Sequence, residues 1–254
     1  MTYKKILVVF FILSLILWTT ALFKKGKLPE VSEILPPLYQ DPVQTEVKMP
    51  PFIVQRKGIV YTITPLFSYE LYGLIVSNHS SKEWFDYYHK SWKDYLNAKD
   101  ICVVWGQNVK NGVYLHGKFT NDVWTCNYRF PYSPGNTIFA SFNPCCLSNN
   151  HLLFSSDTIY RAMMESNRGD QIYLRGFLVT YAHGTFRRGS STTRTDQGNG
   201  ACETIYVTDY RILKKANPLW RNVYAGAKYS MITCALLLVV IQFMTPIKFH
   251  LSQP

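Results

Sequence analysis

The 254-residue sequence contains none of the short motifs that mark the common catalytic sites. It has no glycine-rich phosphate loop, no G-x-S-x-G turn and no H-E-x-x-H helix, so nothing in it indicates a P-loop nucleotidase, an α/β-hydrolase or a zinc protease of these types. The CxxC and HxxxH spacings typical of metal sites are absent too. We therefore expect no metal and no cofactor.

Acidic residues are scarce, with 16 against 27 basic ones. Between the two apolar segments described below, all 16 acidic and 24 of the 27 basic residues leave a net charge of +8. Such a balance favours anionic partners such as lipid headgroups or envelope polymers. Eight of the basic residues flank the apolar segments: Lys24, Lys25, Lys27, Arg211, Lys214, Lys215, Arg221 and Lys228. The remaining interior is close to neutral, which argues against nucleic-acid binding.

The number of cysteines between the two apolar segments is odd. Five of the six lie between the apolar segments, namely Cys102, Cys126, Cys145, Cys146 and Cys202. At least one thiol therefore stays unpaired in a monomer, even in an oxidising compartment. One or two disulfides are compatible with this count, and their pairing cannot be read from the sequence.

Two long apolar segments stand out, at residues 6–23 and 229–247. Each has the roughly 20 residues that a membrane-spanning helix needs. A cleaved signal peptide is the alternative for the first, but Trp18 and Phe23 stand where small residues should mark a cleavage site. Because a five-residue tail before an apolar helix is typical of an exporting anchor, we expect a two-pass bacterial inner-membrane protein. The central domain is then periplasmic and both termini are cytoplasmic.

These spans divide the chain. Residues 1–5 are an N-terminal tail and residues 248–254 a C-terminal tail. Six prolines in residues 24–58 predict an extended stalk, because proline fixes φ and removes a backbone donor. A β-rich domain is expected over 59–213, followed by a basic juxtamembrane segment over 214–228.

Within 59–213, β-branched and aromatic runs bounded by turn residues predict strands. The interval 82–97 changes to a period of 3 to 4, with Trp84, Tyr88, Trp92 and Tyr95, which predicts a helix with an aromatic face in the core. A second, short helix is expected over 157–166. The predicted fold class is a membrane-anchored β-rich α+β protein, with either a small OB-like barrel or another compact β domain carrying two helices.

The segment 188–207 is crowded with polar residues and ends in a strand. With a period of 2, Glu203 shares a face with Ile205 and Val207 and so points inward, where a carboxylate needs a partner. Arg194 is the nearest candidate. Either these residues lock a loop onto the domain, or they form the floor of a pocket in which Arg194 binds an anionic group.

We take the polar residues around this pair as the candidate ligand-binding or structural site: Arg194, Asp196, Glu203, Thr193, Cys202 and His151. No catalytic residue is assigned. Carboxylates beside an arginine are compatible with hydrolysis, but no second motif supports that chemistry.

Four short motifs resemble those of a family of uncharacterised, mostly proteobacterial membrane-anchored proteins. They are Trp105-Gly106, residues 149–152, Gly169-Asp170 and the specific run Thr-Arg-x-Asp-x-Gly-x-Gly-Ala-Cys-Glu at residues 193–203. The resemblance covers roughly residues 60–210 and implies an envelope location, but no reaction.

The leading hypothesis is a membrane protein whose β-rich domain binds or scaffolds a partner at the envelope membrane without catalysis. Lipid, contacted through the two helices and their basic flanks, is one expected partner. Another envelope protein or an anionic envelope component is the other. A membrane-tethered hydrolase using Arg194, Asp196 and Glu203 is the alternative, and nucleic-acid binding by an OB-like domain is a weaker one.

Overall fold

The computed structural model describes residues 2–131, 138–198 and 200–244. It divides into two compact units, one made of Met1–Lys27 with Asn217–Pro254 and the other of Leu28–Ala216. Each is described by itself. Together they give a β-rich α+β protein with a large mixed sheet and two apolar terminal helices.

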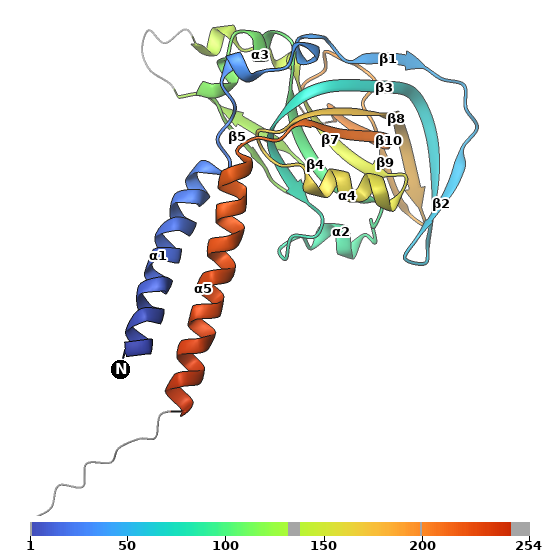
Figure 1. Cartoon of the computed structure of the whole chain (residues 1–254). Coiled ribbons are helices and arrows are strands. Elements are labelled where there is room, and N and C mark those ends of the chain that lie inside the picture. The colour runs from blue at the N-terminus through green and yellow to red at the C-terminus, as the bar shows by residue number, and fades with distance from the viewer. Residues whose placement is uncertain (1, 132–137, 199, 245–254) are drawn as a thin grey trace, which may run out of the picture. The chain divides into compact units, whose positions relative to one another are not determined.

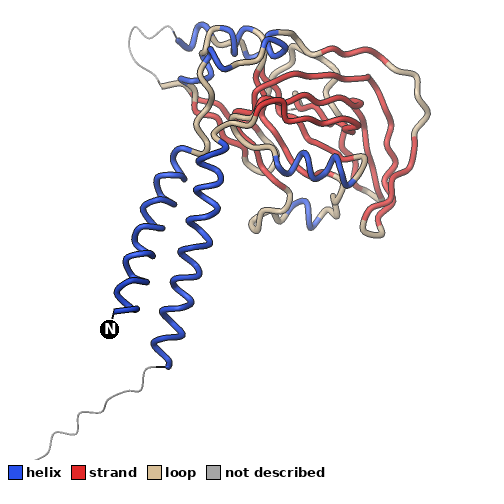
Figure 2. Tube along the Cα trace, viewed as in Figure 1, coloured by secondary structure: helices blue, strands red, loops and turns tan. Residues whose placement is uncertain are grey.

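The first unit contains two helices, α1 (Thr2–Lys24) and α5 (Pro218–Met244), which lie side by side in Figures 1 and 2. Both are long and apolar enough to cross a membrane, with mean hydropathies of 2.7 over Tyr3–Lys24 and 1.7 over Pro218–Met244. The hydroxyls of Ser14 and Ser230 are hydrogen-bonded at 2.8 Å, so the two helices share one of their few polar contacts.

The helix boundaries differ from the expected spans. Residues 2–5 already belong to α1, and α5 begins at Pro218, so most of the expected juxtamembrane segment 214–228 is helical. Proline is favoured at the first helical position because it needs no intrahelical donor there. The end of the second expected span, 245–247, and the tail 248–254 lie outside the described residues.

The second unit is built on an eight-stranded sheet. Its strands are β1 (Val43–Glu46), β2 (Phe52–Arg56), β3 (Ile59–Ser80), β4 (Asn97–Val104), β7 (Leu147–Phe154), β8 (Gln171–His183), β9 (Phe186–Gly189) and β10 (Cys202–Lys214). Five of them pair in a ring, because β3 pairs with β4, β4 with β7, β7 with β10, β10 with β8, and β8 again with β3. The β7–β10 pair is parallel and the other four pairs are antiparallel.

All five ring strands contribute one face to a single buried cluster, in which Leu71, Val103, Leu152, Leu174 and Ile205 are fully buried. The helix α4 (Asp157–Glu165), whose N-cap Ser156 accepts a hydrogen bond from the Ile159 amide, adds Met163 to the same cluster. Alternation of side chains along a strand leaves the opposite face of the ring for other contacts. The candidate sites below lie on both faces.

Gly176 in the middle of β8 allows a close approach of the neighbouring strand. A Cβ at this position would lie 2.1 Å from the carbonyl oxygen of Tyr206 on β10. A glycine inside a strand is typical of such a close approach, and the long strand β3, paired along much of its length with β8, curves in Figure 1.

Residues 28–56 do not form the expected extended stalk. They contain two 3₁₀ helices (Val31–Glu33 and Pro36–Tyr39) and the strands β1 and β2, and Leu38 is completely buried. Leu38 packs against a second cluster with the helix α3 (Gln107–Lys110), the 3₁₀ helix Val113–His116 and the hairpin β5 (Lys118–Asn121) and β6 (Cys126–Arg129). The apolar residues next to the prolines, such as Ile34, Leu35 and Leu38, explain why this segment packs against the second cluster.

The aromatic interval 82–97 also differs from expectation. Only α2 (Tyr88–Ser91) is helical, and the backbone leaves the helix where Lys93 has a positive φ of 54°. Of the predicted stripe, Trp84, Tyr88 and Trp92 are 88%, 47% and 44% exposed, so the stripe does not face the core. Apart from Leu96 at its end, the buried residues of this interval are instead polar, namely Asp86, His89, Asp94 and Asn97.

Candidate functional site

The expected ion pair between Arg194 and Glu203 is present. Arg194 Nη1 donates a 3.0 Å hydrogen bond to Glu203 Oε1, and the Glu203 side chain is only 7% exposed. Burial outweighs the favourable Arg194 charge and raises the pKa of Glu203 to about 7. The Arg194 guanidinium also lies 4.9 Å from the centroid of the Trp105 ring. Its charge is thus already engaged by a carboxylate and by an aromatic face.

Three of the other predicted site residues are organised locally. The Asp196 carboxylate accepts a hydrogen bond from Ser191 Oγ, and the same hydroxyl accepts one of 3.1 Å from the Thr193 amide. The Cys202 sulfur accepts a 3.5 Å contact from Asn149 Nδ2. The first two contacts hold residues 191–196 together, and the third joins β7 to β10. Among the described hydrogen bonds of Asp196, none goes to Glu203.

His151 is not brought to this pair. In the parallel register of β7 and β10, His151 lies opposite Thr204 and Asn150 lies opposite Glu203. Because neighbouring residues of a strand point to opposite faces, His151 faces away from Glu203. The predicted site is therefore divided between the two faces of the sheet.

On its own face, His151 belongs to a chain of polar side chains that we call the buried network. Its members are His79, Asp86, His89, Asn97, Asp100, His151 and Arg188. All but Arg188 are no more than 3% exposed. Polar groups buried this deeply are costly unless they are paired, so their shared location indicates a specific role.

The contacts along the network are short. Asp86 Oδ2 lies 2.8 Å from His79 Nε2 and 2.7 Å from His89 Nδ1. The Asn97 amide nitrogen lies 3.0 Å from both His89 Nε2 and Asp100 Oδ1. Asp100 Oδ2 in turn lies 2.7 Å from His151 Nδ1.

Two nitrogen groups of the network, the Arg188 guanidinium and the Asn97 amide, can only donate, and in this arrangement they assign the proton positions. Arg188 donates to His151 Nε2, so the proton of a neutral His151 is on Nδ1, facing Asp100. In the same way, the Asn97 amide nitrogen leaves the proton of His89 on Nδ1, facing Asp86. Burial alone raises the pKa of Asp100, but His151, followed by Arg188 and His89, outweighs it and leaves that pKa below its usual value.

Trp124 covers the network. Its indole stacks on the His89 ring with centroids 4.4 Å apart and on Trp92 at 5.0 Å, and the Arg188 guanidinium lies 4.5 Å from its centroid. Trp124 thus shields one side of the network, and hydrogen bonds in such a low-dielectric setting are stronger than in water.

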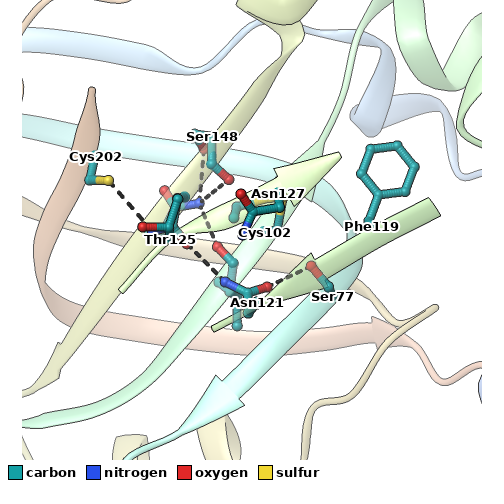
Figure 3. The surroundings of a disulfide bond; sticks show 12 residues. Ser77, Cys102, Phe119, Asn121, Thr125, Asn127, Ser148 and Cys202 are labelled. Atoms are coloured by element: carbon teal, nitrogen blue, oxygen red, sulfur yellow. Dashed lines mark hydrogen bonds between the residues drawn. A yellow bond between two sulfur atoms is a disulfide. The ribbon is translucent and has the colours of Figure 1, made fainter. Parts of the chain in front are cut away.

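A disulfide positions Trp124. Cys102 on β4 is bonded to Cys126 at the start of β6, which ties the β5–β6 hairpin to the ring. Figure 3 shows Asn121 of this hairpin next to the disulfide and hydrogen-bonded to Ser77. Asn149 Nδ2 donates a 2.7 Å hydrogen bond to the Trp124 carbonyl. Among the described residues Cys145, Cys146, Cys202 and Cys234 remain unpaired thiols.

A pocket of about 460 Å³ reaches the network from outside. Its lining residues are Arg56, Lys57, Ser81, Lys82, His89, Lys90, Asp94, Tyr95, Asn97, Ala98, Phe154 and Tyr160. Four of them are lysine or arginine, whereas Asp94 is the single carboxylate in this lining. Burial raises the pKa of Asp94, and Tyr181 donates a 2.6 Å hydrogen bond to it. The pocket therefore offers positive charge at its wall and imidazole and amide groups at its buried end.

Sequence reasoning identified His151 but missed the rest of the network and the pocket. A signal was present, since Asp86 and His89 are three residues apart, as are Asn97 and Asp100. The aromatic periodicity in the same interval concealed it. No family model, no curated protein and no solved structure matches this chain.

Proposed function

We propose that this protein is a membrane-anchored binding protein, without catalytic activity of its own, whose β-rich domain captures an anionic group of an envelope component. The pocket that Lys57, Lys82 and Lys90 line, together with Arg56 in its ion pair with Asp157, is the observation that carries the proposal. Lysine and arginine side chains around a concave surface are the usual means of binding phosphate or carboxylate groups.

We further infer that the ring of five strands is a small OB-like barrel. The supporting observations are the closed order β3-β4-β7-β10-β8, its single parallel pair, and α4 inserted between β7 and β8. Loops at one end of such barrels form binding surfaces in many proteins. The segment 81–95, which carries Lys82 and Lys90, is a loop of this kind between β3 and β4.

The location that fits this function is the bacterial inner membrane, with Leu28–Ala216 in the periplasm. The Cys102–Cys126 disulfide supports this orientation, because disulfides form and persist in oxidising compartments such as the periplasm. The helices α1 and α5 would place the pocket-bearing domain close to anionic lipids and envelope polymers.

A hydrolase centred on Arg194, Asp196 and Glu203 is less well supported. Arg194 is already bonded to Glu203, and Asp196 is bonded to Ser191 within its own loop. The geometry favours the structural reading, in which Arg194 and Glu203 lock the loop 190–201 onto the sheet.

The proposal is tested by titrating the purified full-length protein in detergent with inorganic phosphate in the presence of EDTA. We expect saturable binding that weakens roughly 2- to 5-fold in each of Lys82→Gln and Lys90→Gln, as is typical for losing one partly exposed ionic contact. Lys48→Gln, which removes an exposed lysine outside the pocket, serves as the control. Equal affinity in all four proteins would exclude the pocket as the anion site.

A further inference from the structure

We propose that His79, Asp86 and His89 form a binding site for a divalent transition-metal ion, with Zn²⁺ as the best match to the ligands. Each residue offers one ligand atom: His79 Nε2, Asp86 Oδ2 and His89 Nδ1. These three atoms lie within 4.8 Å of one another. Two imidazole nitrogens and one carboxylate oxygen are a common ligand set for zinc sites with an open position.

The burial of these residues distinguishes them from a surface cluster. Asp86 is fully buried and both histidines are 3% exposed. Both imidazoles converge on one oxygen of Asp86, at 2.8 and 2.7 Å, while the other oxygen accepts a 3.1 Å hydrogen bond from the His89 amide. The side chains are thus held in the orientation that binding would require, so little conformational entropy is lost.

The second ring nitrogen of each histidine also faces a polar side chain. Glu83 Oε1 lies 3.8 Å from His79 Nδ1, and the Asn97 side chain lies 3.0 Å from His89 Nε2. A carboxylate such as Glu83 orients the imidazole of a metal site by accepting its remaining N–H, whereas the Asn97 amide nitrogen that faces His89 can only donate.

Metal binding requires both histidines to change tautomer. In the free site, His79 Nε2 and His89 Nδ1 carry the protons that face Asp86 Oδ2. When the cation occupies these nitrogens, the proton of His79 moves to Nδ1, 3.8 Å from Glu83 Oε1, and the proton of His89 moves to Nε2 and needs an acceptor. A turn of the Asn97 carboxamide supplies Oδ1, a buried atom that has no hydrogen-bond partner among the described residues. Asp100 then loses the amide donor of Asn97 but keeps His151 at 2.7 Å.

The site lies where a cation would act on the proposed ligand. Of the three ligands, His89 lines the pocket of about 460 Å³, together with Asn97 behind it, and we place the cation's open coordination position toward that cavity. A bound cation would add a direct oxygen contact to the positive wall formed by Lys82 and Lys90. This inference deepens the proposed function, since it names a metal-assisted mode of anion capture.

The test is direct metal binding by the full-length protein, purified without a histidine tag and stripped with EDTA. Isothermal titration with Zn²⁺ should give one site per chain, and Co²⁺ should give the visible absorption of a low-symmetry nitrogen–oxygen site. Asp86→Asn and His89→Gln should each weaken Zn²⁺ binding at least 10-fold, as expected for losing one of three ligands. His116→Gln, which removes an exposed histidine elsewhere, should bind normally.

The wild-type measurements remain decisive where a variant fails to fold. Absence of both a Zn²⁺ binding isotherm and a Co²⁺ spectrum in folded wild-type protein overturns the metal site. Zn²⁺ binding that survives in folded Asp86→Asn and His89→Gln overturns it as well. Phosphate binding is measured in EDTA, without metal. A negative result in one assay therefore contradicts only the proposal that this assay tests, the metal site or the anion pocket.

Discussion

Arg194 and Glu203, nine residues apart on a loop and the strand that follows it, are joined by a 3.0 Å hydrogen bond at the edge of the buried cluster. The carboxylate is buried and its partner is partly exposed. The pair therefore combines an electrostatic attraction with a substantial desolvation cost, and both can be measured.

Glu203 should make the stability of the domain dependent on pH. Its pKa rises from 4.5 in the unfolded chain to about 7 in the folded one, so the stabilisation is complete below about pH 4.5 and is lost as the pH rises through 7. The difference corresponds to roughly 3 kcal/mol. Thermal unfolding midpoints from pH 4.5 to 8 should fall less steeply in Glu203→Gln than in wild type. Glu46→Gln, an exposed acid, is the control, and parallel profiles of Glu203→Gln and wild type would refute the shift.

Arg194→Lys separates a structural lock from a ligand site. Lysine keeps the charge but loses the planar contact with the Trp105 ring, 4.9 Å away. We expect a destabilisation of about 1 kcal/mol and faster proteolysis within residues 190–201, with phosphate affinity unchanged. Loss of phosphate binding in a variant of wild-type stability would favour the ligand reading instead.

The disulfide should be detectable by thiol counting. Alkylation of the denatured, non-reduced protein should modify four of the six cysteines, and reduction should release the other two, Cys102 and Cys126. Replacing both by alanine should cost roughly 3 kcal/mol, because the bond closes a loop of 24 residues. Cys202→Ala is the control. Six reactive thiols without reduction would contradict the bond and remove its support for a periplasmic domain.

Gly176→Ala should be poorly tolerated. The added Cβ would lie 2.1 Å from the Tyr206 carbonyl oxygen, a backbone atom that cannot move without disturbing the β8–β10 ladder. We expect a loss of about 2–3 kcal/mol in the free energy of unfolding, the upper range for overpacking. At Gly189 the nearest atom is Thr180 Oγ1 at 3.2 Å, so Gly189→Ala should cost clearly less. Equal losses of stability in Gly176→Ala and Gly189→Ala would show that the backbone of β8 shifts to accept the added Cβ.

Membrane orientation is tested with reporter fusions. Alkaline phosphatase, which is active only after export, should be inactive when fused after residue 254 and active when inserted at Gly58, whose added Cβ would meet no atom within 4 Å. The opposite pattern would reverse the orientation and place the disulfide-bearing domain in the cytoplasm.

Local sequence patterns determined the elements whose signal is local. The apolar runs of α1 and α5, the short helix expected over 157–166, the inward side of Glu203 and the partnership with Arg194 all follow from composition or from a period of 2 or 3.6. Each depends on residues only a few positions apart.

Tertiary structure alone decided which distant residues meet. Asp100 and His151 become neighbours only through the β4–β7 register, and Asp86 meets His79 only because the segment 81–95 folds back onto β3. The same segment misled the sequence reading, since its aromatic period of 3 to 4 resembles a core helix while its buried side chains are Asp86, His89 and Asp94. Burial is a property of strand pairing and loop placement, and these are set by long-range packing that no short window of sequence contains.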